Sequence, residues 1–243
     1  MGWSAGGCCT EYTMPSAESF LPSDHGFPFT NSWPSQPAVA LATPFGRITV
    51  GDASAGLCGG MVFAAFDYWR AGIPPPAEQP DADHPLYRCI VRRLVDSWHL
   101  PVGVTQYYQW MNLPDGDSGF TVLGRRVVTD RGVAWRTIRV QWPQIRSDLD
   151  HGTPVALGVV TVASANPIDL GQNHQILAYD YEKTGDRVSL RVYDPNQGAR
   201  DDVEIRFDTG DPTRPTTFEH NLGLAHPIRG FFRSAYAPVR PPF

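Results

Sequence analysis

A cysteine in a loop of small residues is the first candidate for chemistry in this chain. Cys58 lies within Gly56-Leu57-Cys58-Gly59-Gly60, so little side-chain bulk surrounds its sulfur. The run that follows, Met61–Arg70, has apolar side chains three and four residues apart, as in a helix with one buried face. A thiol at the start of a helix lies near the positive end of the helix dipole, which favours thiolate over thiol. Cys58 is therefore a candidate nucleophile, and a small buried core cysteine is the alternative.

A histidine and an aspartate far downstream could complete such a site. His174 opens an expected strand over 174–181, and Asp194 follows a second expected strand over 188–193. The turn residues 183–186 join the two strands into an antiparallel hairpin, so its open end should bring His174 and Asp194 together. A carboxylate there can accept a hydrogen bond from one imidazole nitrogen and leave the other facing a nucleophile.

Each residue also has a structural alternative. His174 alone could be a hydrogen-bonded histidine at a sheet edge, Asp194 alone could form a turn before Pro195, and Asn196 is a weaker rival for the orienting role. The other histidines are expected in loops or on the surface: His25, His84, His99, His151, His220 and His226.

The elements that must position these residues are helices followed by strands. We expect helices from Cys58 to before Gly72, then over Leu86–Trp98, Thr105–Met111 and Trp142–Asp150. We expect further strands over Thr121–Val128, Val133–Val140, Thr153–Val162, Val203–Phe207 and Ile228–Tyr236. The third of these is almost continuously apolar, which is typical of a central strand. This order predicts an α+β fold with an antiparallel sheet.

Composition limits the domain organisation and the partners. The 243 residues, 42% of them hydrophobic, suffice for one large packed domain. We expect an arm over residues 1–45, rich in proline and aromatic residues and packed on the body, and one domain over 46–243. The net charge of −5 argues against a nucleic-acid partner.

Cysteine usage and hydropathy exclude other classes. Cys8, Cys9, Cys58 and Cys89 form no disulfide framework, and Cys89 is expected in the core. No spacing typical of metal ligands occurs, so neither a metal nor another cofactor is expected. No signal peptide or membrane span is recognisable, which predicts a soluble protein, with the cytoplasm favoured over secretion.

Taken together, these segments resemble papain-like cysteine peptidases. The pattern is most similar to the bacterial C39-like branch, in which a "GxPV" strand, an "HxVxVxGYD" strand and a "DP" follow one another. The corresponding segments here are Thr153-Pro154-Val155, Asn173–Asp180 and Tyr193-Asp194-Pro195, downstream of Cys58-Gly59-Gly60. The resemblance covers about residues 50 to 210.

The resemblance implies a papain-like fold and a role for each site residue. Cys58 would be the nucleophile, His174 the general base and later acid, and Asp194 the orienting carboxylate. The reaction would be amide hydrolysis on a peptide or protein substrate, through an acyl-enzyme. An acyltransferase or transglutaminase-like enzyme with the same triad is one alternative, and a weak or inactive fold acting as a binding or toxin module is another. Oligomeric state stays open.

One position departs from the family pattern. Papain-like enzymes usually place a glutamine about six residues before the nucleophile, and Asp52 stands there in this chain. An ionised carboxylate donates no hydrogen bond and would repel an oxyanion. Three possibilities follow: Asp52 is protonated, another group such as Ser54 donates, or the oxyanion hole is absent. The backbone N–H of Cys58 would be the other donor.

Overall fold

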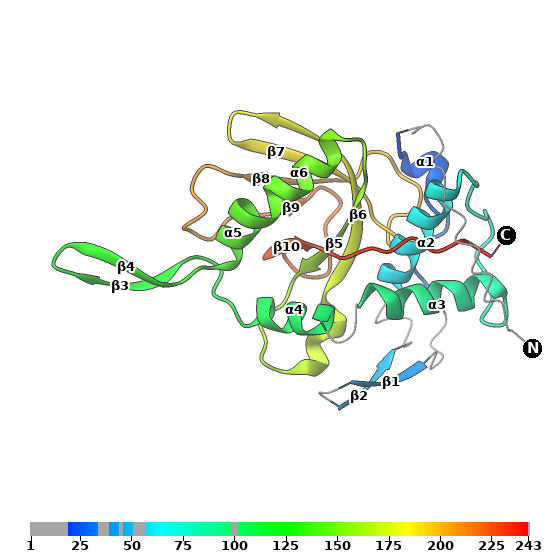
Figure 1. Ribbon diagram of the computed structural model, residues 1–243, viewed down its shortest axis with the longest axis horizontal. Helices are drawn as coiled ribbons and strands as arrows, with labels where there is room; N and C mark the ends of the chain where they lie inside the picture. Colours follow the sequence, from blue (N-terminus) through cyan, green and yellow to red (C-terminus); the bar gives the residue numbers. More distant parts are fainter. Residues whose placement is uncertain (1–18, 34–38, 44–45, 51–56, 99–101, 243) are drawn as a thin grey trace, which may run out of the picture.

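The fold is α+β, as expected: helices pack on an antiparallel sheet (Figure 1). The computed structural model describes residues 19–33, 39–43, 46–50, 57–98 and 102–242. The α-helices are α1 (Pro22–His25), α2 (Cys58–Ala71), α3 (Pro85–Ser97), α4 (Val102–Met111), α5 (Val133–Trp135) and α6 (Trp142–Asp150). A π-helix, η2 (Arg136–Gln141), joins α5 to α6, and a 3-10 helix, η3 (Pro167–Gln172), precedes β6.

The main sheet has six antiparallel strands in the order β10-β5-β6-β7-β8-β9. They are β5 (Val155–Val160), β6 (His174–Thr184), β7 (Arg187–Tyr193), β8 (Glu204–Asp208), β9 (Glu219–His220) and β10 (Gly230–Arg233). Two separate hairpins complete the strands: β1 (Val39–Thr43) with β2 (Gly46–Val50), and β3 (Ser118–Val122) with β4 (Arg125–Asp130). All of β5 is buried, because strands flank it on both edges and helices cover both faces.

The two faces of the sheet carry separate cores. Alternate residues of a strand point to opposite faces, so Leu177 packs with α2 and α3 while its neighbour Ile176 packs with α6. The helix α2 is buried along almost its whole length because the sheet, α3 and the N-terminal segment surround it. This burial fixes its first residue, Cys58, relative to the sheet.

Two glycines at the start of α2 allow its close approach to neighbouring elements. A Cβ on Gly59 would lie 2.3 Å from Gln175 Oε1 and 2.5 Å from Ser97 Oγ. A Cβ on Gly60 would lie 2.1 Å from the carbonyl oxygen of Ile90 in α3. The glycines that follow Cys58 therefore allow the helix to dock.

A β-bulge interrupts the pairing of β6 with β7. Asp180 pairs with Arg191, but Ala178 pairs with Val192, so Tyr179 is an extra residue in β6. Such a bulge changes which side chains of the two strands share a face.

A buried ion pair ties α2 and α3 to the C-terminal segment. Arg93 Nε lies 2.7 Å from Asp67 Oδ2, and both side chains are buried. Asp67 also accepts hydrogen bonds from the Tyr236 hydroxyl and from the Val239 N–H, while Arg93 donates to the carbonyl of Ala237. The chain after β10 is thereby held across these helices.

The described residues of the expected N-terminal arm lie on the body. Phe20 and Phe27 are buried against α2, and Trp33 Nε1 donates to the carbonyl of Pro80. The strand β1 belongs to the same stretch of sequence and pairs with β2, across the boundary drawn at residue 45.

The prediction for residues 121–140 was wrong. The expected strand over Thr121–Val128 is divided by a turn at Leu123-Gly124, and Val133–Val140 is helical. The β-branched residues of the second segment favoured a strand. Its buried residues, however, follow helical spacing at Val133, Thr137 and Ile138, continuing to Trp142 in α6.

Cys89 differs slightly from expectation, because it is half-buried at the side of α3 rather than in the core. Within the described part of the chain, no helix combines the length and the apolar character needed to cross a membrane.

Candidate active site

The three residues expected to act together come from three elements that meet at one end of the sheet. Cys58 is the first residue of α2, His174 is the first residue of β6, and Asp194 follows the last residue of β7. All three are buried, with exposed fractions of 8%, 8% and 0%.

His174 and Asp194 are in direct contact. His174 Nε2 lies 2.8 Å from Asp194 Oδ1. Because this contact uses Nε2, Nδ1 is the ring nitrogen left for another group. The Cys58 side chain hydrogen-bonds to His174, so the histidine lies between the sulfur and the carboxylate.

The bulge at Tyr179 accounts for the placement of Asp194. Continuing the pairing of Leu177 with Tyr193 puts Asp194 opposite Ile176, two residues from His174 and on its face of the sheet. If the pairing of Asp180 with Arg191 continued without a bulge, Asp194 would lie opposite Leu177 and would point to the other face. The bulge therefore gives His174 its carboxylate partner.

The electrostatics of the pair favour a charged histidine. Burial disfavours the charged ring, but the charge of the Asp194 carboxylate and the hydrogen bonds that the ring donates to Asp194 and Cys58 raise the pKa of His174 to about 10. Burial also opposes the charge of Asp194. The charge of His174 and the hydrogen bonds that the Asp194 carboxylate accepts nevertheless hold the pKa of Asp194 well below its usual value. An imidazolium held on a carboxylate is thus the stable state near neutral pH.

A second histidine, His220, contacts the same carboxylate. His220 Nε2 lies 3.1 Å from Asp194 Oδ2, and its Nδ1 accepts a hydrogen bond from the N–H of Leu222 at 3.2 Å. Since Nδ1 is an acceptor, Nε2 carries the proton and donates to Asp194. The prediction that His220 is a loop or surface residue was wrong, because His220 is 7% exposed and lies in β9.

Asn31, in the N-terminal segment, joins the two loops that carry Cys58 and Asp194. Its Oδ1 accepts from the N–H of Leu57 at 2.9 Å, and its backbone N–H donates to the carbonyl of Pro195. Its Nδ2 donates to Asn196 Oδ1 at 3.2 Å. The Asn196 side chain therefore contacts Asn31, and Asp194 is the residue whose side chain contacts the His174 ring.

Tyr107, in α4, holds the start of β6 from another direction. Its hydroxyl donates to the carbonyl oxygen of His174 at 3.1 Å. Burial and the nearby Cys58 raise the pKa of Tyr107 well above its usual value, although a hydrogen bond from Gln175 opposes the shift. The phenol therefore stays a neutral donor at the back of the site.

The remaining predicted residue, Asp52, lies outside the described residues, as does Ser54. The described residues contain no group of three or more His, Cys, Asp or Glu side chains arranged to hold a metal ion. Cys58, His174 and Asp194 have the chemistry of a nucleophile, a proton carrier and an orienting carboxylate.

His220 and Asn31 had no recognisable pattern in the sequence. His220 lies in a two-residue strand, which is too short for periodicity, and Asn31 lies in a segment rich in proline and aromatic residues.

In comparisons with protein-family models, with curated proteins and with solved structures, nothing matched this chain.

Proposed function

We propose that the protein is a cysteine-dependent hydrolase of papain-like architecture that cleaves an amide bond, in a peptide or an isopeptide, through an acyl-enzyme on Cys58. The observation that supports this most directly is the contact of His174 with both Cys58 and Asp194 at the start of a helix. A core cysteine has no need of a buried, carboxylate-bound histidine beside it.

The proposed reaction has two halves. In the first, the Cys58 thiolate attacks the amide carbonyl carbon, the C–N bond breaks, and His174 gives its proton to the leaving amine. In the second, His174 takes a proton from water, the water oxygen attacks the thioester carbon, and the C–S bond breaks. Asp194 keeps the same ring nitrogen occupied throughout, so Nδ1 carries the transferred proton.

Alkylation of cysteine tests the nucleophile before any substrate is known. Iodoacetamide should label Cys58 faster than the half-buried Cys89 near neutral pH, although Cys58 is the more buried of the two. Replacing His174 with alanine should slow the labelling of Cys58 and leave Cys89 unchanged. The matched control is His151→Ala, which removes an exposed histidine outside the site. Equal labelling rates for the two cysteines in the native protein would contradict the proposal.

Turnover is tested with a mixture of short fluorogenic peptide amides. Cleavage that is lost in Cys58→Ser and reduced in Asp194→Asn supports hydrolysis. Label at Cys58 without cleavage of any amide or ester would instead favour an inactive binding module. A new amide formed on addition of a primary amine would assign the same site to acyl transfer.

A further inference from the structure

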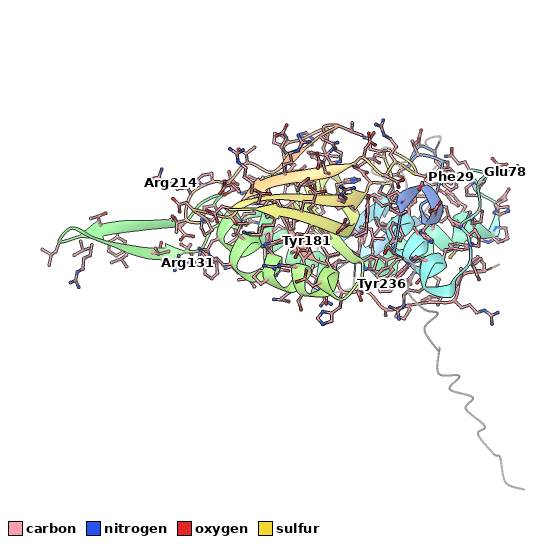
Figure 2. All side chains as sticks on the ribbon, turned by 90° about the horizontal axis from the view of Figure 1, so that it is seen from above. Phe29, Glu78, Arg131, Tyr181, Arg214 and Tyr236 are labelled. Carbon is pink, nitrogen blue, oxygen red and sulfur yellow. The ribbon has the colours of Figure 1, made fainter. Side chains whose placement is uncertain are left out.

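The hairpin of β3 and β4 projects away from the rest of the molecule. Figure 1 shows the two strands extending beyond the sheet, and Figure 2 shows the same projection from above. Its apolar side chains are unusually exposed: Phe120, Val122, Leu123, Val127 and Val128. Phe120 and Val127 pair across the strands, so with Val122 they form one apolar face.

The tip of this hairpin is a leucine in an unfavourable backbone conformation. Leu123 has φ 48°, and it is the one non-glycine residue with positive φ in the part of the chain that the structure describes. With Gly124 at φ 77° it forms a two-residue turn in which asparagine is the favoured first residue. Leu123 is also 99% exposed. Neither turn geometry nor packing within the chain accounts for a leucine at this position.

The charge of the hairpin differs from that of the whole chain. The net charge of the protein is −5, but the hairpin, residues 118–130, carries Arg125 and Arg126 beside its turn and one acidic residue, Asp130, at its base. A five-residue strand spans about 17 Å, roughly twice the screening length of about 8 Å at physiological salt. The projection therefore removes the cationic tip from the field of the acidic body.

The base of the hairpin is held firmly. Asp117 accepts hydrogen bonds from the N–H of Gly132 at 3.0 Å and from Arg131 Nη1 at 2.5 Å, and its own N–H donates to the carbonyl of Thr213. The guanidinium of Arg131 lies over the ring of Trp135. The direction in which the tip points is thus fixed by the body.

We propose that the β3–β4 hairpin docks the protein on an anionic membrane surface, with Leu123 entering the boundary between headgroups and acyl chains and Arg125 contacting lipid phosphates. This inference is independent of the proposed chemistry at Cys58. The projection favours a membrane over a groove in a partner protein. The element that projects farthest is the first to reach a planar membrane, whereas a flat apolar patch on the body would suffice to bind a groove in another protein. Both outer edges of the hairpin keep unpaired backbone groups, so the insertion is limited to the tip.

Sedimentation with vesicles tests the docking. The full chain should co-sediment with vesicles of phosphatidylcholine containing phosphatidylglycerol, bind less to phosphatidylcholine alone, and dissociate as salt rises. Leu123→Asn should weaken binding at least about tenfold, because full burial of a leucine strengthens binding by roughly ten- to a hundredfold. Arg125→Gln should weaken it about fivefold on the anionic vesicles alone.

The leucine variant separates lost binding from lost folding. Asparagine is favoured at a positive φ, so Leu123→Asn should keep or raise the melting temperature. The matched control is Val140→Thr, which changes an exposed apolar residue of η2, and it should bind like the native protein. The proposal is overturned if Leu123→Asn leaves vesicle binding unchanged, or if the native protein binds both vesicle types equally. A dimer that the variant dissociates, without vesicle binding, assigns the tip to a second copy and also overturns it.

Discussion

At the scale of single residues, the candidate site is organised around Asp194. Its Oδ1 contacts His174 and accepts the N–H of Asn196 at 2.8 Å, while its Oδ2 accepts from His220. Both oxygens are thus occupied, and the carboxylate cannot rotate without losing a buried hydrogen bond. His220 adds a donor to the second oxygen of Asp194, so it holds the carboxylate in the orientation that contacts His174.

Replacing His220 tests this orienting role. His220→Leu removes the donor and should slow alkylation of Cys58 about tenfold, because a buried hydrogen bond to a charged group contributes roughly 1.5–3 kcal/mol. His220→Gln retains an N–H near the position of Nε2 and should recover most of the rate. The readouts are the pH profile of Cys58 alkylation and the free energy of unfolding. A leucine variant that loses stability but keeps the native pH profile would show a structural role alone.

The predictability of these residues follows from how each is encoded. His174 and Asp194 are predictable because both flank strands of one hairpin, whose ends must meet. The bulge that brings them to one face is not predictable, since nothing in Ala178-Tyr179-Asp180 distinguishes it from a regular strand. The contact of His220 depends on the order of strands in the sheet, which local patterns do not contain.

At the scale of elements, α2 depends on how closely its first turn approaches α3 and β6. The sequence suggested that the glycines after Cys58 leave space around its sulfur. The structure gives them a second role, because Gly59 faces side-chain ends while Gly60 faces the backbone of Ile90. Adding a methyl group should therefore lower the free energy of unfolding by different amounts at Gly59 and at Gly60.

Alanine at these two glycines should have unequal effects. Gly60→Ala should lower the free energy of unfolding by about 2 kcal/mol, since the Ile90 carbonyl cannot move aside without shifting α3. Gly59→Ala should cost less, because Gln175 and Ser97 can change rotamer. Urea denaturation of both variants measures the difference. Equal costs would mean that α2 and α3 adjust as easily as side chains do.

Elements dominated by one pattern were predictable, and those with conflicting patterns were not. The glycine at the end of α2 and the unbroken apolar run of β5 define those elements in the sequence. In Val133–Val140, β-branched composition opposes helical spacing, and packing of Val133 and Ile138 into the interior decides in favour of the helix. The β3–β4 turn has leucine where asparagine is usual, so the most common sequence feature of such a turn is missing.

At the scale of the whole molecule, the paired charges of the site should make stability depend on pH. The pKa of His174 is raised from its ordinary value of 6.5 to about 10 in the folded protein. A group with a raised folded pKa stabilises the fold fully below its unfolded pKa, and this contribution is lost as pH rises toward the folded value. The contribution of Asp194 has the opposite sign: it is present above the unfolded pKa of this group and is lost in acid.

The free energy of unfolding should therefore fall between pH 7 and pH 9, by at most about 1.4 kcal/mol per pH unit for one proton. Urea denaturation at several pH values gives this slope. The slope should disappear in His174→Gln and persist in His151→Gln, which removes an exposed histidine. A native protein whose stability is constant over this range would contradict the ion pair.

The bulge at Tyr179 also determines how the β6–β7 hairpin can change in length. Between the bulge and the turn at Gly185 the strands pair regularly, so losing one residue from each strand shortens the hairpin and leaves the pairing at Leu177 unchanged. Losing one residue from β7 alone instead moves Asp194 opposite Leu177 and turns it to the other face, whereas losing one from β6 alone compensates for the extra residue at Tyr179. The outer hairpin can thus be lengthened or trimmed in matched steps without disturbing the site, whereas an unmatched loss from β7 removes the contact between the two side chains.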